Sequence, residues 1–201
     1  MKKIIPLTLC AILAACGGTS VVDLNDQAEV AAMQQVMELE YRDWTKTAEK
    51  MTDSMLKSNA LSGVQKPVIA VANIKNDTMQ RFDTDILIKK IRTTILKSGR
   101  AQIATNFTGE DTTSDKVRSI RGNDEYDQAT FAQKGTLIAP NMSLSGKMIQ
   151  RNLKLQSGWF SSVDTRVEYY LQLTLTDLKT GLSVWEDEQP IIKEGKDAPT
   201  W

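Results

Sequence analysis

Two short strings of the sequence carry residue types that serine acyl-transfer enzymes use. Ser54-Met-Leu-Lys57 fits an S-x-x-K pattern, which places a nucleophilic serine one helical turn before a lysine that can activate it. Lys179-Thr180-Gly181 fits the K-T-G triplet on the substrate side of such sites. The sequence has no Ser-Asp-Asn string to complete the set, and a hairpin turn would by itself explain the glycine of the triplet. We expect both matches to be coincidental and the protein not to be an enzyme.

The usual catalytic and metal-binding side chains are scarce in this chain. It contains no histidine, which removes the commonest general base and the commonest metal ligand. The two cysteines, Cys10 and Cys16, lie near the N-terminus, so we expect no internal disulfide or cysteine-based metal site. A glycine-rich phosphate cradle is also missing from the sequence. We therefore expect no metal and no cofactor.

Composition and charge favour one ordinary globular domain with an appended segment. Of the 201 residues, 41% are hydrophobic and 25% are charged, with 25 basic and 25 acidic side chains. Because the formal net charge is zero, the chain has no basic excess to attract nucleic acid, and we exclude that class of partner.

The N-terminus has the pattern of an export signal. Lys2 and Lys3 precede an apolar segment, residues 4–12, that is too short to span a bilayer. Leu13-Ala14-Ala15-Cys16 resembles the bacterial lipoprotein box, in which the cysteine thiol receives a diacylglyceryl group and becomes the new N-terminus. An ordinary secretory signal with an incidental cysteine is the alternative.

The lipoprotein box implies that residues 1–15 are removed and that Cys16 carries the lipid. Gly17 rather than aspartate follows the cysteine, which by the enterobacterial sorting rule implies the outer membrane, with the protein facing the periplasm. Residues 16–40 are then a lipidated tether, which we expect to be partly helical because residues 26–40 have apolar side chains at helical spacing.

The stretch 66–99 predicts a buried strand followed by a helix. Residues 68–74 form a continuous apolar run rich in β-branched side chains, which is typical of a strand covered on both faces. Asp83 or Thr84 is a suitable N-cap for the helix, and Gly99 a suitable end. The expected apolar positions of this helix are Leu87, Ile88, Ile91, Ile95 and Leu96.

A second helix is expected to start at a cap, Asp43, and to carry an apolar stripe of Trp44, Ala48, Met51 and Met55. Further strands are expected at 101–106, 141–152 with a bulge at Gly146, 167–176 and 182–192, with one or two short helices within 109–133. Strict alternation is clearest at Val167, Tyr169, Leu171, Leu173 and Leu175.

These elements predict an α/β fold with a mixed sheet of about four to five strands flanked by helices and ending in an antiparallel hairpin. One domain, residues 41–192, holds them all. Residues 193–201 are expected to form a loosely held tail.

Two segments could contact a partner. Asn76, Asp77, Thr78 and Arg81 follow the buried strand at its carboxyl end, where α/β sheets often place sites, although an Asx turn that positions the helix is the alternative. Trp159 and Phe160 lie in a loop between strands and would serve either as a contact anchor or as a small satellite cluster.

Several strings together resemble the LpoB family of outer-membrane lipoproteins that activate penicillin-binding proteins, over residues 41–192 and at the lipoprotein box. They are Tyr41-Arg-Asp-Trp44 leading into a helix that ends Ser54-Met-Leu56, the run VIAVANIKNDTMQ after Pro67, Ile91-Arg-Thr-Thr-Ile-Leu-Lys-Ser-Gly99, and Tyr170-Leu-Gln-Leu-Thr-Leu with Thr180-Gly-Leu-Ser-Val-Trp185. The resemblance implies a non-enzymatic protein that binds a bifunctional class A penicillin-binding protein and stimulates peptidoglycan synthesis. It also implies a fold related to the N-terminal domain of the translocation protein TolB.

The chain departs from the enterobacterial members in its short tether, where they have a long proline- and glutamine-rich one, which leaves the identity of the synthase open. The alternative function is that of CsgG-like lipoproteins, which assemble secretion or surface structures as rings. The sequence shows no alternating hairpin suited to membrane insertion, so we expect a monomer.

Overall fold

The computed structural model describes residues 22–23, 26–32, 36–105, 111–132, 134–155 and 165–195. The chain divides into two compact units, residues 1–34 and 35–201. The described part of the first unit holds one short helix, α1 (Gln27–Ala32). All other described elements belong to the second unit.

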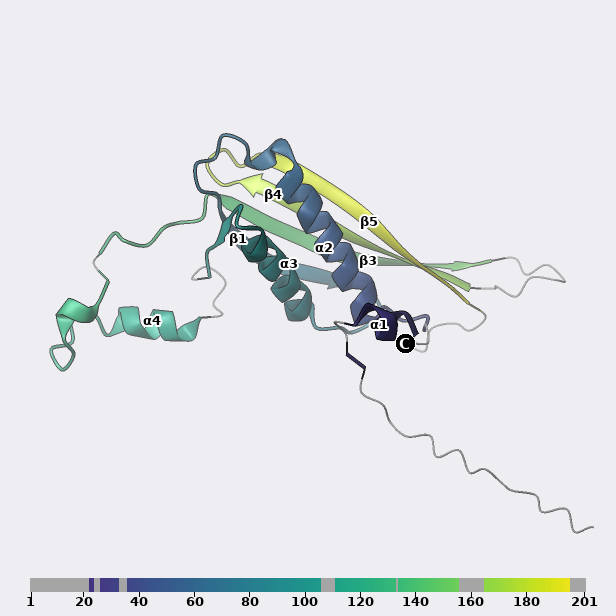
Figure 1. Cartoon of the computed structure of the whole chain (residues 1–201), viewed down its shortest axis with the longest axis horizontal. Coiled ribbons are helices and arrows are strands. Elements are labelled where there is room, and N and C mark those ends of the chain that lie inside the picture. The colour runs from purple at the N-terminus through teal and green to yellow at the C-terminus, as the bar shows by residue number, and fades with distance from the viewer. Residues whose placement is uncertain are drawn as a thin grey trace, which may run out of the picture. The chain divides into compact units, whose positions relative to one another are not determined.

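Five strands of the second unit form one mixed sheet in the order β2-β1-β3-β4-β5, shown in Figure 1. β1 pairs in parallel with β2 and with the central strand β3, whereas β3, β4 and β5 form an antiparallel meander. The predicted α/β class, mixed sheet and closing hairpin are confirmed. The strands are β1 (Val68–Asp77), β2 (Gln102–Ile103), β3 (Met142–Lys154), β4 (Thr165–Asp177) and β5 (Ser183–Gly195).

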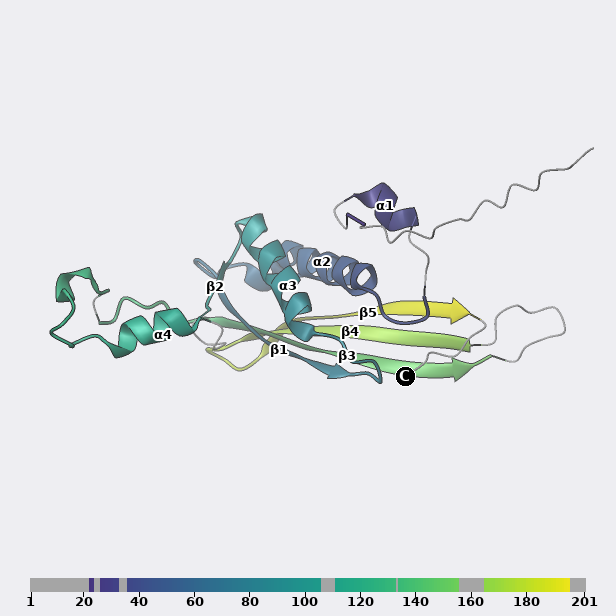
Figure 2. The ribbon, with the colours of Figure 1, turned by 90° about the horizontal axis from the view of Figure 1, so that it is seen from below.

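Two long helices cover one face of this sheet. α2 (Tyr41–Lys57) and α3 (Thr84–Ser98) lie side by side on it, and η1 (Asn59–Leu61) follows α2 (Figures 1 and 2). None of the described elements covers the opposite face (Figure 2). Between β2 and β3 lie α4 (Thr112–Ser119) and η2 (Gln128–Thr130), which bury no residue.

The core lies between the sheet and the two helices. Because side chains alternate along a strand, all five predicted inward residues of β4 are buried there, from Val167 to Leu175. The predicted apolar stripe of α2, from Trp44 to Met55, is buried opposite them, as are four positions of α3: Leu87, Ile88, Ile91 and Ile95.

Two details of the helices differ from the prediction. α2 begins at Tyr41 with Glu40 as N-cap, because the Asp43 carboxylate accepts a hydrogen bond from the Glu40 amide (3.0 Å) and so lies inside the first turn. In α3, Leu96 is 56% exposed, because it falls outside the stripe that faces the sheet. Asp83 is the N-cap of α3 and Gly99 ends it with a φ of 65°, as expected.

The strands differ in length and in the position of the bulge. β1 continues to Asp77, and β2 has only two residues instead of the expected six. The register shifts in β1, between Val71 and Ile74, rather than at Gly146 of β3. Gly146 is needed for a different reason, since a Cβ there would lie 2.4 Å from the Gln172 carbonyl oxygen.

The folded domain extends beyond the predicted residues 41–192 at both ends. Residues 36–40, which we name the lead-in, belong to the second unit, and the Leu39 side chain is buried in its core. β5 runs on to Gly195, and Lys193, expected in a loose tail, is only 7% exposed. Its ammonium group lies 2.5 Å from Asp43 Oδ2 and 3.4 Å from Glu40 Oε2, so a partner distant in sequence holds it in place.

Candidate protein-docking surface

The loop after β1 is held by its own side chains. Asn76 Oδ1 accepts hydrogen bonds from the Thr78 amide (3.1 Å) and the Thr78 hydroxyl (2.7 Å), which is an Asx turn. Asn76 Nδ2 donates to the Gln80 carbonyl at 2.9 Å. The single hydroxyl proton of Thr78 is shared between Asn76 Oδ1 and this carbonyl, whose oxygen also lies 2.9 Å from Thr78 Oγ1. These two predicted contact residues are therefore occupied in shaping the loop.

The same loop presents other side chains to solvent. Asp77 and Arg81 are exposed, and Met79 is 63% exposed although it is apolar. The Met79 amide donates to Gln150 Oε1 of β3 (3.0 Å), which fixes the backbone under this side chain. The surface of the loop thus combines an apolar residue with one charge of each sign.

Aromatic contacts connect this loop to α2. Phe82 stacks on Trp44 with ring centroids 6.3 Å apart, and Trp44 meets the edge of Tyr41 at 5.0 Å. Trp44 is buried, whereas Tyr41 is partly exposed at the first position of α2. The loop and the start of α2 are therefore parts of one packed surface.

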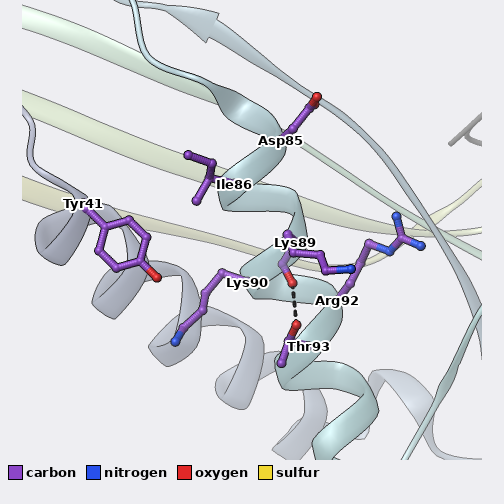
Figure 3. Close-up of a pocket in the computed structure, with 7 residues that line it drawn as sticks. All are labelled: Tyr41, Asp85, Ile86, Lys89, Lys90, Arg92 and Thr93. Carbon is purple, nitrogen blue, oxygen red and sulfur yellow. Dashed lines mark hydrogen bonds between the residues drawn. The ribbon is translucent and has the colours of Figure 1, made fainter. Parts of the chain in front are cut away.

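A groove of about 500 Å³ lies at the first turns of α2 and α3 (Figure 3). Tyr41 of α2 and Ile86 of α3 point toward each other across it, and Ile86 is 45% exposed. The lining residues are Tyr41, Asp85, Ile86, Lys89, Lys90, Arg92 and Thr93. We call this groove, with the exposed Asp77, Met79 and Arg81, the docking surface.

Charged side chains line the groove. Lys89 and Asp85 are exposed, whereas Arg92 is only 9% exposed. Lys90 pairs with Glu49 of α2 at 2.8 Å, across the helix pair. A charged rim around an exposed apolar pair is typical of a surface that contacts another protein. The apolar side chains supply most of the binding energy, and the charges set the orientation of the partner.

Sequence reasoning did not find the groove. Ile86 could have drawn attention, since it is a large apolar residue just before a stripe that Leu87, Ile88, Ile91 and Ile95 already fill. That Tyr41 lies beside Ile86 depends on how the two helices pack, which sequence periodicity does not determine.

Other predicted residues stand apart from this surface or outside the described residues. Cys16, Trp159 and Phe160 lie outside the described residues. Ser54 and Lys57 are exposed on α2, and Lys179-Thr180-Gly181 forms the β4–β5 turn, where Asp177 Oδ1 accepts the Lys179 amide (2.7 Å). Gly181 there has a φ of 74°, so the turn accounts for the glycine.

Among the residues that the structure describes, no group of histidine, cysteine, aspartate and glutamate side chains could hold a metal ion. No helix within the described ranges has both the length and the apolar character needed to cross a membrane.

The fold is that of a small α/β domain whose helical side carries a groove lined by charged and exposed apolar residues. Residues 43–191 match the family described as the peptidoglycan-synthase activator LpoB, and the chain belongs to this family. The family is one of activators, which agrees with the resemblance seen in the sequence.

Solved structures similar to the chain include LpoB from Escherichia coli. Its C-terminal domain is 14% identical, covering 74% of this chain and 98% of that one with a TM-score of 0.43. The NMR structure of E. coli LpoB is 14% identical over 96% and 93% of the two chains, with a TM-score of 0.42. Lipoprotein GNA1162 from Neisseria meningitidis is 10% identical over 67% and 88%, with a TM-score of 0.35. No curated protein matches the sequence.

Proposed function

We propose that the protein is an outer-membrane lipoprotein that binds a bifunctional class A penicillin-binding protein and activates it allosterically. The match to the peptidoglycan-synthase activator family over residues 43–191 carries the proposal. Activation without chemistry requires the protein to bind the active state of the synthase more tightly than the resting state.

The docking surface is the part of the domain that suits this role. Its exposed Lys89 suits a carboxylate on the synthase surface, and the facing Tyr41 and Ile86 call for an apolar side chain between them. The exposed Met79 extends the apolar contact onto the loop.

Capture of synthases from solubilised envelopes tests the proposal. Soluble chain from Asn25 onward is the bait, and we expect a class A penicillin-binding protein to be retained and its glycan polymerisation to be faster in the presence of the chain. If no synthase is retained and the chain instead assembles into a large ring, the proposal is wrong and the CsgG-like alternative is favoured.

A matched pair of variants tests the surface. Ile86→Asp is expected to lower synthase affinity by about tenfold or more, because it replaces one of the two facing apolar residues of the groove with a carboxylate. Leu182→Asp is the control, since Leu182 is also exposed but lies in the β4–β5 turn, next to the start of β3 and so at the other end of the sheet. Equal affinities of the two variants would place the contact elsewhere.

Membrane attachment rests on Cys16. Cys16→Ser removes the thiol that would receive the diacylglyceryl group, and we expect the protein to move from the membrane fraction to the periplasmic fraction. Retention of this variant in the membrane would contradict lipidation at Cys16. We also expect no acylation of Ser54 by a fluorescent penicillin.

A further inference from the structure

Gln80 joins the lead-in to the loop after β1. Its side-chain amide bonds both backbone groups of Leu39: Oε1 accepts from the Leu39 amide at 2.7 Å, and Nε2 donates to the Leu39 carbonyl at 3.0 Å. The Leu39 side chain is buried in the core. The chain is therefore fixed to the domain at this point by one residue of the loop.

The backbone of the same residue closes the loop. The Gln80 carbonyl accepts hydrogen bonds from Asn76 Nδ2 and Thr78 Oγ1, so the loop conformation depends on where this carbonyl lies. Gln80 thus holds the lead-in with its side chain and residues 76–78 with its main chain.

The lead-in continues directly into the groove. Glu40 bonds Arg42 (2.8 Å) and lies 3.4 Å from the ammonium group of Lys193, and Tyr41, which lines the groove, follows it. Residues 39–41 therefore contact the loop through Gln80 and the groove through Tyr41.

We infer that Gln80 is a positioning residue that makes the docking surface depend on a seated lead-in. When residues 36–40 occupy their place, the Gln80 side chain holds the loop against them; when they leave, the loop loses this support. The segment that leads to the proposed lipid anchor then regulates the surface that meets the synthase. This inference rests on the proposed function.

The test uses full-length chain in detergent with Gln80→Met, which keeps the side-chain volume and the main-chain carbonyl but removes both bonds to Leu39. Hydrogen exchange at three amides reports the coupling: Leu39, bonded to Gln80; Thr78, bonded to Asn76; and Met79, bonded to Gln150. We expect all three to exchange faster and synthase affinity to fall by about tenfold, with the far-UV circular dichroism spectrum unchanged.

Gln189→Met is the matched control, because the Gln189 amide bonds Lys50 and Asp187 rather than the lead-in. Its exchange at the three amides and its synthase affinity should equal those of the wild type. If Gln80→Met unfolds the domain, Gln80→Glu takes its place, since it keeps one acceptor for the Leu39 amide but cannot donate to the Leu39 carbonyl.

Two outcomes would overturn the inference. Faster exchange confined to Leu39 would show that the loop does not depend on the lead-in. If all three amides exchange faster in Gln80→Met but the synthase affinity is unchanged, the docking surface does not depend on the loop. If the wild type bound no synthase, the proposed function would fail, while the exchange measurement would still decide whether Gln80 couples the two segments.

Discussion

Gly146 is a position where no other residue fits the sheet. A Cβ built there would lie 2.4 Å from the Gln172 carbonyl oxygen and 2.6 Å from Leu173 Cδ2 of the neighbouring strand. Because one of these neighbours is backbone, the strands would have to separate to make room. We expect Gly146→Ala to lower the free energy of unfolding by about 1–3 kcal/mol, measured by urea denaturation followed by circular dichroism. Ser145→Ala, one residue away on the uncovered face, is the control, and equal midpoints for the two variants would contradict the expectation.

Because of Tyr169, we expect the free energy of unfolding to fall as the pH becomes alkaline. Burial raises the pKa of its hydroxyl above the ordinary value of 10.0, and the carboxylates of Glu38 and Asp43 raise it further. Because the folded state holds this proton more tightly than the unfolded state, stability is complete below pH 10 and falls by up to about 1.4 kcal/mol per pH unit above it.

Tyr169→Phe removes this titration. We expect its unfolding free energy to fall less steeply than that of the wild type between about pH 9 and about pH 11. Tyr126→Phe, at an exposed tyrosine, should follow the wild type. If the unfolding free energy of Tyr169→Phe falls as steeply as that of the wild type, groups other than Tyr169 cause the decline.

Residue-level predictions from sequence succeeded where the partner is close along the chain. The Asx turn at Asn76 and the N-cap at Asp83 each involve an amide two residues away, so the local pattern contains the whole interaction. The ion pair between Lys193 and Glu40 joins residues 153 positions apart, and the Gln80–Leu39 bonds join residues 41 apart. The spacing of apolar residues along the sequence carries no information about such distant contacts. For this reason Lys193 was expected in a loose tail.

At the scale of elements, the contact between β5 and α2 is secured by buried charge. Lys193 near the end of β5 reaches two carboxylates of the first turn of α2, Glu40 and Asp43. Lys193→Met would leave both carboxylates partly buried without this cation. We expect the unfolding free energy to fall by about 2 kcal/mol, less than for a fully buried pair because Glu40 also bonds Arg42. Lys46→Met, at an exposed lysine of α2, is the control, and equal losses would show that the position of the lysine does not matter.

Elements with strong periodicity were predictable and short ones were not. The alternation in β4 and the stripe of α2 each repeat over several turns or residues, and burial of one face is enough to fix them. β2 has two residues that pair with the start of β1, and its length is set by where the chain turns away rather than by its own sequence. The groove is likewise a property of two packed helices and not of either sequence segment.

At the scale of the whole molecule, the lead-in belongs to the folded unit. Two chains that both end at Trp201 test this, one starting at residue 36 and the other at Tyr41. The shorter chain lacks the buried Leu39 and the Glu40 carboxylate, so we expect its melting temperature to be lower by roughly 5 °C or more. Identical melting temperatures would show that residues 36–40 belong to the tether and not to the folded domain.

This boundary also limits the proposed reach from the membrane. If Cys16 carries the lipid, only the twenty residues from 16 to the start of the lead-in separate the anchor from the domain. Fully extended, they span at most about 70 Å, and any helical part shortens this. The folded domain must therefore begin within that distance of the outer membrane, and the partner must present its docking site near this point.

The uncovered face of the sheet should tolerate substitutions better than the face that packs against the helices. Every second residue of β4, from Arg166 through Thr174, alternates with the buried core residues, and among these outward residues only Glu168 is buried. A saturation library scored by cellular abundance should accordingly show tolerated codons alternating with intolerant ones along this strand. The protein can thus change half of its longest strands with little loss of fold, and that half is where related chains have room to diverge.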